Sequence, residues 1–115
     1  MTICPQGNAL ASGGQAVEDA PVISTHVLDT EKGAPASGVR VQLFYREELV
    51  ADRETDDDGR VRDLADVEPG TYRLVFHPSS PFFKRIEAEI EIEAGRDHHV
   101  PLLLSPYACA IYRGS

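Results

Sequence analysis

Between residues 86 and 93, apolar and acidic side chains alternate without interruption. The apolar set is Ile86, Ala88, Ile90 and Ile92, and every residue between or after them is a glutamate. A period of two residues is that of a β-strand with one buried and one solvated face. Shorter runs at 39–46 and 71–76 follow the same period, and helical periodicity is absent. The sequence therefore predicts a fold made of strands.

Turn-forming residues separate the alternating runs. Asp58-Gly59 and Glu68-Pro69-Gly70 combine residue types that accept the backbone angles of tight turns. Beyond the runs already named, the expected strands include 22–29 and a final hairpin at about 98–104 and 107–113. We therefore expect an all-β domain of about seven to eight strands, built as an antiparallel β-sandwich or an open barrel.

Length and charge narrow the class of protein. At 115 residues the chain has room for one domain, expected at 22–115, because residues 1–21 lack periodic apolar residues and are typical of a disordered tail. A domain this small buries only about 60–70% of its chain surface, so association would add stability. The formal charge of −8 disfavours nucleic acid and anionic membranes as partners, and no apolar run could span a bilayer.

The cysteine content indicates the compartment. The chain has two cysteines, Cys4 in the expected tail and Cys109 near the end, which is too few for a disulfide framework. No basic segment followed by a continuous apolar stretch marks a signal peptide. We therefore expect a reduced, cytoplasmic protein.

Two candidate sites have a simpler structural interpretation. The acidic segment that starts at Glu54 resembles a calcium loop, but Ala65 stands where a bidentate glutamate is required, so a plain turn is favoured. Cys109 could act as a nucleophile beside a histidine. A lone cysteine in an apolar segment is more often a small buried residue.

The histidines allow several interpretations. His98 and His99 are adjacent on an expected strand, so they point to opposite faces and cannot bind one ion together. A zinc site would need His26, His77 and one of this pair to converge from three strands, without help from cysteine. Taken singly, His26 is typical of a structural strand histidine, and Arg60 of a surface cation.

Several short segments each say little about the family of the protein, but together they form a recognisable pattern. They are residues 24–29, 38–41, 55–60, 70–72, 76–77 and 99–106, followed by Tyr112-Arg113-Gly114-Ser115. Together they resemble the transthyretin-like family over about 22–115. The terminal tetrapeptide resembles the mark of the 5-hydroxyisourate hydrolases in that family, which the hormone-carrying transthyretins do not have.

The resemblance implies a transthyretin-like (prealbumin-like) sandwich that assembles as a homotetramer with sites in a channel between subunits. It implies hydrolysis of a ring amide of the small molecule 5-hydroxyisourate in urate degradation, with no metal and no cofactor. The matching catalytic positions are His26, Arg60 and His99, and the pocket-lining positions are Tyr112, Arg113 and Ser115. In this scheme His99 is our choice of base, His26 orients water or substrate, and Arg60 stabilises the developing oxyanion.

Two segments depart from the family pattern. A brief link over 77–86, rich in proline and serine, replaces a longer excursion with a short helix. Residues 108–111, Ala-Cys-Ala-Ile, replace an aromatic and hydroxyl-bearing run that faces the channel in the family. Substrate preference therefore stays open, as do two other classes of function: a carrier that binds a small molecule without turnover, and a monomeric β-sandwich interaction module.

Overall fold

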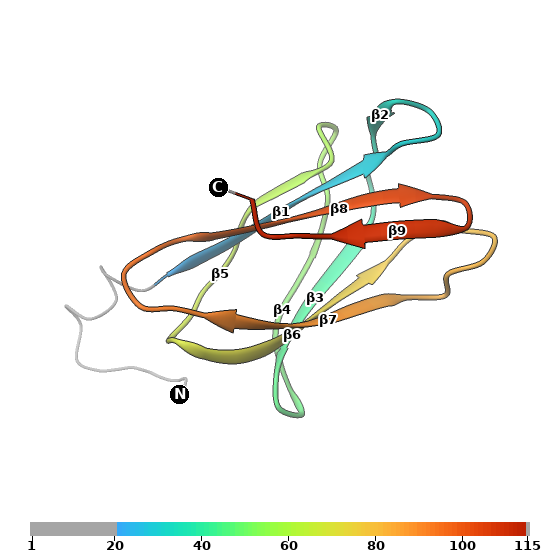
Figure 1. Cartoon of the computed structure of the whole chain (residues 1–115). Helices are drawn as coiled ribbons and strands as arrows, with labels where there is room; N and C mark the ends of the chain where they lie inside the picture. The colour runs from blue at the N-terminus through green and yellow to red at the C-terminus, as the bar shows by residue number, and fades with distance from the viewer. Residues whose placement is uncertain (1–20, 115) are drawn as a thin grey trace.

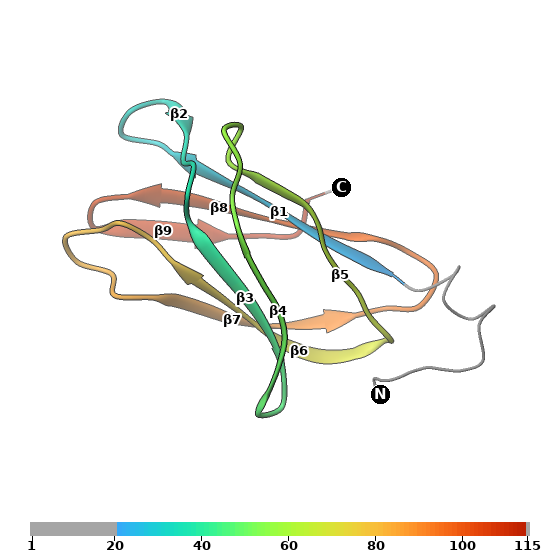
Figure 2. The ribbon, with the colours of Figure 1, turned by 180° about the vertical axis from the view of Figure 1, so that it is seen from behind.

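The computed structural model describes residues 21–114, which form two β-sheets packed face to face (Figures 1 and 2). The described strands are β1 (Val22–Asp29), β2 (Ala34–Pro35), β3 (Arg40–Tyr45), β4 (Glu48–Glu54), β5 (Arg60–Asp66), β6 (Gly70–His77), β7 (Ile86–Ile92), β8 (His98–Ser105) and β9 (Ala108–Ile111). The predicted all-β sandwich is confirmed. The count is nine and not the expected seven or eight, because β2 has only two residues and β4 has a single buried one, so neither carries a periodic signal.

The first sheet has the order β2-β1-β8-β9, and β5 also pairs with β1. The second sheet has the order β4-β3-β6-β7. Every pair is antiparallel, as expected, except β1 with β8, which run parallel along their whole length. Parallel neighbours need a long crossover connection, and here that connection is the entire second sheet together with β2 and β5.

The core lies between the two sheets and is filled by the inward face of each strand. The fully buried side chains include Ile23, Val27, Leu43, Leu64, Leu74, Phe76, Ile92 and Leu102. On β7 the alternation seen in the sequence becomes a division between faces: the strand begins and ends on a buried isoleucine, and its glutamates are exposed. The apolar period of two is thus the physical reason that the sheets pack.

Pro21 is the first described residue, and it packs with the strands that follow. Residues 1–20 of the predicted tail lie outside the described residues. Pro21, which we had assigned to the tail, is buried, and its carbonyl accepts a hydrogen bond from the backbone N–H of Val67 at 3.0 Å. Pro21 is therefore held to the segment between β5 and β6 through Val67. Residues 21–114 contain no helix with the length and apolar character needed to cross a membrane.

Candidate active site

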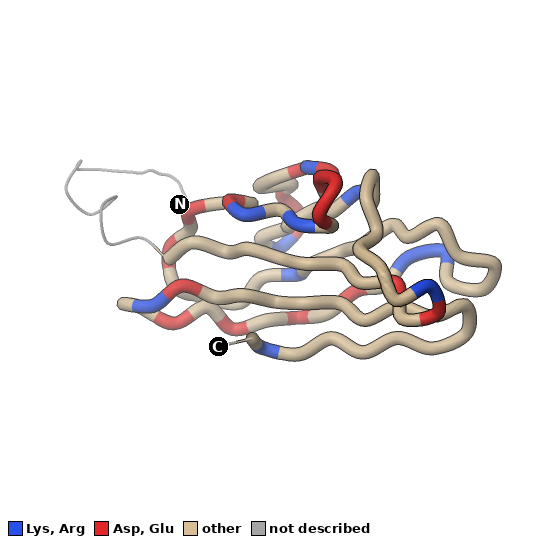
Figure 3. Tube along the Cα trace, turned by 90° about the horizontal axis from the view of Figure 1, so that it is seen from above, with Lys and Arg blue, Asp and Glu red and all other residues tan. Residues whose placement is uncertain are grey.

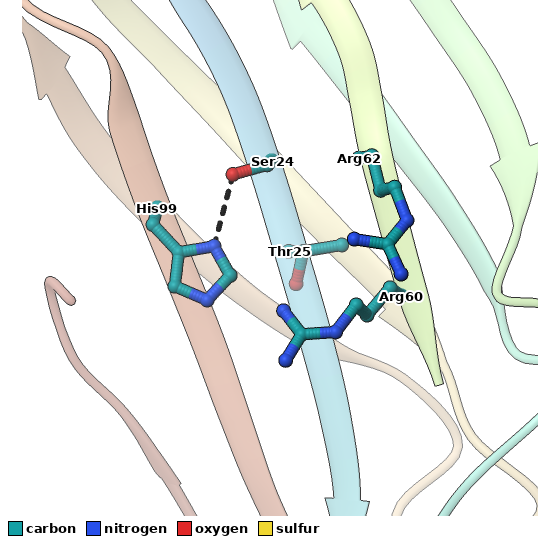
Figure 4. Close-up of a pocket in the computed structure, with 5 residues that line it drawn as sticks. All are labelled: Ser24, Thr25, Arg60, Arg62 and His99. Carbon is teal, nitrogen blue, oxygen red and sulfur yellow. Dashed lines mark hydrogen bonds between the residues drawn. The ribbon is translucent and has the colours of Figure 1, made fainter. Parts of the chain in front are cut away.

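An open hollow of about 210 Å³ lies where β5, β1 and β8 run side by side in the first sheet (Figure 4). Its lining consists of Ser24, Thr25, Arg60, Arg62 and His99. Two guanidinium groups and one imidazole therefore gather at one place on a chain whose formal charge is −8. Such a local reversal of charge favours a polar or anionic small molecule.

A tight turn positions Arg60 at the start of β5. The Asp56 carboxylate accepts hydrogen bonds from the backbone N–H groups of Asp58 and Arg60, each at 2.9 Å. Gly59 has a φ of 75° and its carbonyl accepts a hydrogen bond from Val27 at 2.7 Å. A Cβ on Gly59 would lie 2.5 Å from the Val27 carbonyl oxygen, so only glycine lets the turn lie against β1.

His26 stands directly opposite Arg60 in the pairing of β1 with β5. Its Nε2 lies 2.9 Å from the backbone oxygen of Asp58. Since a carbonyl only accepts, Nε2 carries the hydrogen and donates it, and Nδ1 is the free ring nitrogen of the neutral form. His26 lies beside the hollow and is not among the residues that line it.

His99 lines the hollow from β8 and is half-buried. Its partner in the parallel register is Ser24, whose Oγ lies 2.9 Å from Nδ1 of the imidazole. Burial lowers the pKa of His99 below its ordinary value of 6.5, and the charges of Arg60 and His26 lower it further. His99 is therefore neutral at neutral pH, as a group that accepts a proton must be.

The neighbouring His98 points the other way. It is buried, and its Nε2 accepts a hydrogen bond from the backbone N–H of Glu93 at 3.2 Å. His77 is on the second sheet, where its Nε2 lies 2.6 Å from the side-chain oxygen of Gln42. The convergence that a zinc site would need does not occur, and within residues 21–114 no group of three His, Cys, Asp or Glu side chains is arranged to hold a metal ion.

The end of the described chain returns to His99. The backbone N–H of Gly114 donates to the carbonyl of His99 at 2.7 Å. Tyr112 is half exposed and Arg113 is exposed, and neither lines the hollow within a single chain. Ser115, the last predicted pocket residue, lies outside the described residues. The structure thus brings Arg60 and His99 together, and leaves the side chains of Tyr112 and Arg113 at the periphery.

Sequence reasoning missed three residues that line the hollow: Ser24, Thr25 and Arg62. Ser24 and Arg62 could have been found from the period of two, because Ser24 precedes His26 by two residues and Arg62 follows Arg60 by two. Arg62 also lies 3.7 Å from the carboxylate of Asp58, and both side chains are largely exposed. Its guanidinium is thus held near the hollow and stays open to solvent.

These groups suit one type of chemistry. A neutral imidazole can take a proton from water, and a fixed guanidinium can donate hydrogen bonds to an oxygen that becomes negatively charged. Arg60 and His99 border one hollow from opposite sides of β1, so a small molecule between them would meet both (Figure 4). The arrangement fits addition of water to a polarised carbonyl carbon.

The model of the HIUase/Transthyretin family matches residues 23–114 of this chain. A probable 5-hydroxyisourate hydrolase from Schizosaccharomyces pombe is 36% identical to it, over 83% of this chain and 92% of the relative. A 5-hydroxyisourate hydrolase from Pseudomonas aeruginosa is 37% identical, over 81% of this chain and 90% of the relative.

A solved structure shows the same likeness in three dimensions. The 5-hydroxyisourate hydrolase of Klebsiella pneumoniae superimposes with a TM-score of 0.75 and 31% sequence identity, and the match covers 83% of this chain and 99% of that one. The likeness extends over nearly all described residues, so it includes the three strands that carry the hollow. The transthyretin-like fold expected from the sequence is confirmed.

Proposed function

The chain belongs to the HIUase/Transthyretin family, and from that membership we propose that it hydrolyses 5-hydroxyisourate in the degradation of urate. The observation that carries the proposal is the neutral imidazole of His99 beside the guanidinium of Arg60 at one hollow. The relatives that share over a third of its residues are named for the same reaction.

The proposed mechanism starts with water held between His99 and a ring carbonyl of the substrate. The imidazole takes one proton from the water while the water oxygen forms a bond to the carbonyl carbon. The carbonyl electron pair moves to its oxygen, and the N–H groups of Arg60 stabilise that oxyanion. The ring C–N bond then breaks, the nitrogen receives the proton from His99, and a carboxyl group is left on the opened ring. A positioned base contributes roughly 10²–10⁴-fold and an oxyanion donor roughly 10²–10³-fold.

His26 has a supporting part in this scheme. Because its Nε2–H is committed to the carbonyl of Asp58, it can receive a hydrogen bond only at Nδ1. It therefore orients water or substrate and keeps the Asp56–Arg60 turn in place. The choice of His99 as the base is supported by its lowered pKa and by its place in the lining of the hollow.

We propose that the enzyme works as a homotetramer, with Tyr112, Arg113 and Ser115 completing pockets between subunits. Support comes from the free edge of β9, whose residues are mostly exposed. Edge strands are usually protected by charge, yet residues 98–112 contain no Lys, Arg, Asp or Glu, and the β8–β9 hairpin is uncharged throughout (Figure 3). Close to the turn of that hairpin, Phe82 and Tyr107 are exposed, with ring centroids 6.0 Å apart.

Light scattering tests the assembly. We expect four times the chain mass for the unmodified protein. We expect a smaller species for Ala110→Lys, because a lysine on β9 gives the edge the charge it lacks. A matched lysine at Ala94, exposed beyond the end of β7, should leave the mass unchanged. A monomeric unmodified protein would instead support the interaction-module alternative.

We also propose a cytoplasmic location. Cys109 is a free thiol, and free thiols persist where the compartment keeps them reduced. Fractionation of the native cells, followed by detection of the protein, tests the location. Recovery from an oxidising compartment would contradict it.

The activity itself is tested by the ultraviolet decay of freshly prepared 5-hydroxyisourate. The protein should accelerate the decay, and His99→Asn or Arg60→Glu should abolish the acceleration. Arg53→Glu, at an exposed position on the second sheet, is the charge-matched control and should retain full activity. Stoichiometric binding without turnover would support the carrier alternative, and an unaccelerated decay would contradict the proposed hydrolase.

The role proposed for Ser115 has a separate test. A tag fused to the C-terminus should impair turnover if Ser115 borders the pocket, whereas an N-terminal tag should have no effect. Equal activity of the two fusions would place the terminal residue outside the site.

A further inference from the structure

We infer that Ser24 and Gly114 are positioning residues, which hold the imidazole of His99 from two sides and leave its Nε2 as the proton acceptor. We call this pair the imidazole clamp. The clamp concerns the orientation and tautomer of one ring. Only its effect on turnover rests on the proposed function, because the tautomer can be measured without any substrate.

The first half of the clamp is a hydrogen bond between neighbouring strands. Ser24 and His99 are register partners in the parallel pairing of β1 and β8, and Ser24 Oγ lies 2.9 Å from Nδ1 of the ring (Figure 4). Both residues are partly buried, so water does not compete freely for this contact. A serine hydroxyl can donate or accept, and the surrounding charges decide which of the two it does.

Those surroundings are cationic on one side of the ring. In Figure 4, Nε2 is on the side of the ring away from Ser24, toward the part of the hollow where Arg60 lies. An N–H group at Nε2 would bring its positive end closer to the charge of the Arg60 guanidinium, which acts on this ring. A lone pair there is attracted to that charge instead. The favoured tautomer therefore has its hydrogen on Nδ1, donates it to Ser24 Oγ, and presents the Nε2 lone pair to the hollow.

The second half of the clamp is the absence of a side chain at Gly114. The backbone N–H of Gly114 donates to the His99 carbonyl at 2.7 Å, which draws the chain against the ring. A Cβ on Gly114 would lie 2.8 Å from Cδ2 of the imidazole and 3.4 Å from Cγ. Carbon atoms in contact normally stay about 3.5–4.0 Å apart, so any side chain at this position would push the ring out of place.

Ser24 and Gly114 both restrain rotation of the His99 ring. Ser24 bonds the Nδ1 edge of the ring, and Gly114 approaches its Cδ2 edge. A base must be held in both orientation and tautomer before its proton affinity becomes useful, and buried hydrogen-bond partners commonly provide this. The close approach to His99 therefore explains why residue 114 of the terminal tetrapeptide is a glycine. This explanation does not depend on any contact of Tyr112 or Arg113 with substrate.

The experiment combines nitrogen NMR of the His99 imidazole with steady-state kinetics. In the unmodified protein we expect the neutral ring to carry its hydrogen on Nδ1. Ser24→Ala should shift the ring toward the Nε2–H form and lower kcat by roughly 10-fold to 100-fold, the range typical of lost orienting hydrogen bonds, with KM little changed. Ser24→Thr keeps a hydroxyl and should restore both the tautomer and most of kcat.

Gly114→Ala tests the other side of the ring. Its added methyl should displace the imidazole, weaken the bond to Ser24 and change the His99 signals, with far-ultraviolet circular dichroism unchanged. Ser37→Ala, at an exposed serine between β2 and β3, is the matched control and should alter neither signal nor rate.

The clamp is overturned by an Nε2–H tautomer in the unmodified protein, or by unchanged His99 signals in Ser24→Ala and Gly114→Ala. An Nδ1–H tautomer in a protein without hydrolase activity would support the clamp and contradict the proposed function. The two conclusions can therefore fail separately.

Discussion

Arg60 and His99 border one hollow from the two strands that flank β1, and the positive charge of the first helps to lower the pKa of the second. The same guanidinium that would stabilise an oxyanion thus also keeps the imidazole unprotonated. Burial is the largest cause of the lowered pKa, and His26 adds to it. Oxyanion stabilisation and base competence are coupled through a single side chain.

This coupling predicts the pH dependence of turnover. A base is active only when neutral, so kcat/KM should stay constant at neutral pH and fall as the pH drops through the pKa of His99. Because that pKa is lowered from 6.5, the acid limb should lie below pH 6.5. Arg60→Gln should move the limb upward, in addition to slowing the reaction, and an NMR titration of His99 measures the shift directly. A limb above pH 6.5 in the unmodified protein would contradict the assignment of His99 as the base.

A second prediction concerns Arg62, which lines the hollow while its side chain stays largely exposed. An exposed ionic contact contributes about 0.2–1 kcal/mol. Arg62→Ala should therefore raise KM by about 1.4-fold to five-fold and leave kcat nearly unchanged. Arg53→Ala, on the other sheet, is the control and should leave both unchanged. A fall in kcat at constant KM would show instead that Arg62 acts on the transition state.

The alternation of apolar and polar residues allowed most of the strands to be predicted. It allowed only some of the site residues to be predicted. The alternation at 86–93 identifies β7 because each isoleucine faces the core. β4, in contrast, is an edge strand with one buried residue, Ala51, so its sequence has no periodic signal to detect. The parallel register of β1 and β8 depends on how the two sheets stack, which no local segment encodes. For that reason Ser24 could not be linked to His99 before the structure was known.

A third prediction concerns stability. Burial raises the pKa of Asp66, and the nearby charges of Asp63 and Asp97 raise it further. The pKa of this carboxyl group is higher in the folded than in the unfolded chain, so the ionised form destabilises the fold. The fold is therefore more stable when Asp66 is protonated, and this part of its stability is lost as the pH rises. Asp66→Asn should therefore raise the Tm at pH 7, by on the order of 2 °C. The gain should shrink as the pH approaches 3.8, the ordinary value for this carboxyl.

The control for Asp66 is Asp57→Asn, at an exposed carboxyl in the turn before β5. It removes the same charge from an acidic protein, so it separates the local effect at Asp66 from the general benefit of a smaller net charge. Equal Tm gains in the two variants would show that the clustering of Asp63, Asp66 and Asp97 has no effect of its own.

A fourth prediction uses the turn that carries Arg60. Gly59→Ala combines a positive φ with a Cβ only 2.5 Å from the Val27 carbonyl oxygen. The two effects should together lower the free energy of unfolding by about 2–5 kcal/mol. Gly38→Ala shares the positive φ of 72° but has open space around its Cβ, so it should lose only about 1–2 kcal/mol. Urea denaturation measures both, and similar losses would mean that the turn can move away from β1.

The parallel pairing of β1 with β8 also determines at what stage of synthesis and folding the site can form. Ser24 and His99 are 75 residues apart in the sequence, so their contact closes a loop that contains most of the domain. Contacts between residues far apart in the sequence make folding slow, because the chain loses conformational entropy before the contact forms and stabilises the fold. During synthesis, β2 and β5 can pair with one edge of β1, whereas its other edge stays unpaired until β8 has been made. A growing chain therefore has no complete site until β8 is in place, and until then the edge of β1 that β8 will cover can pair with other chains.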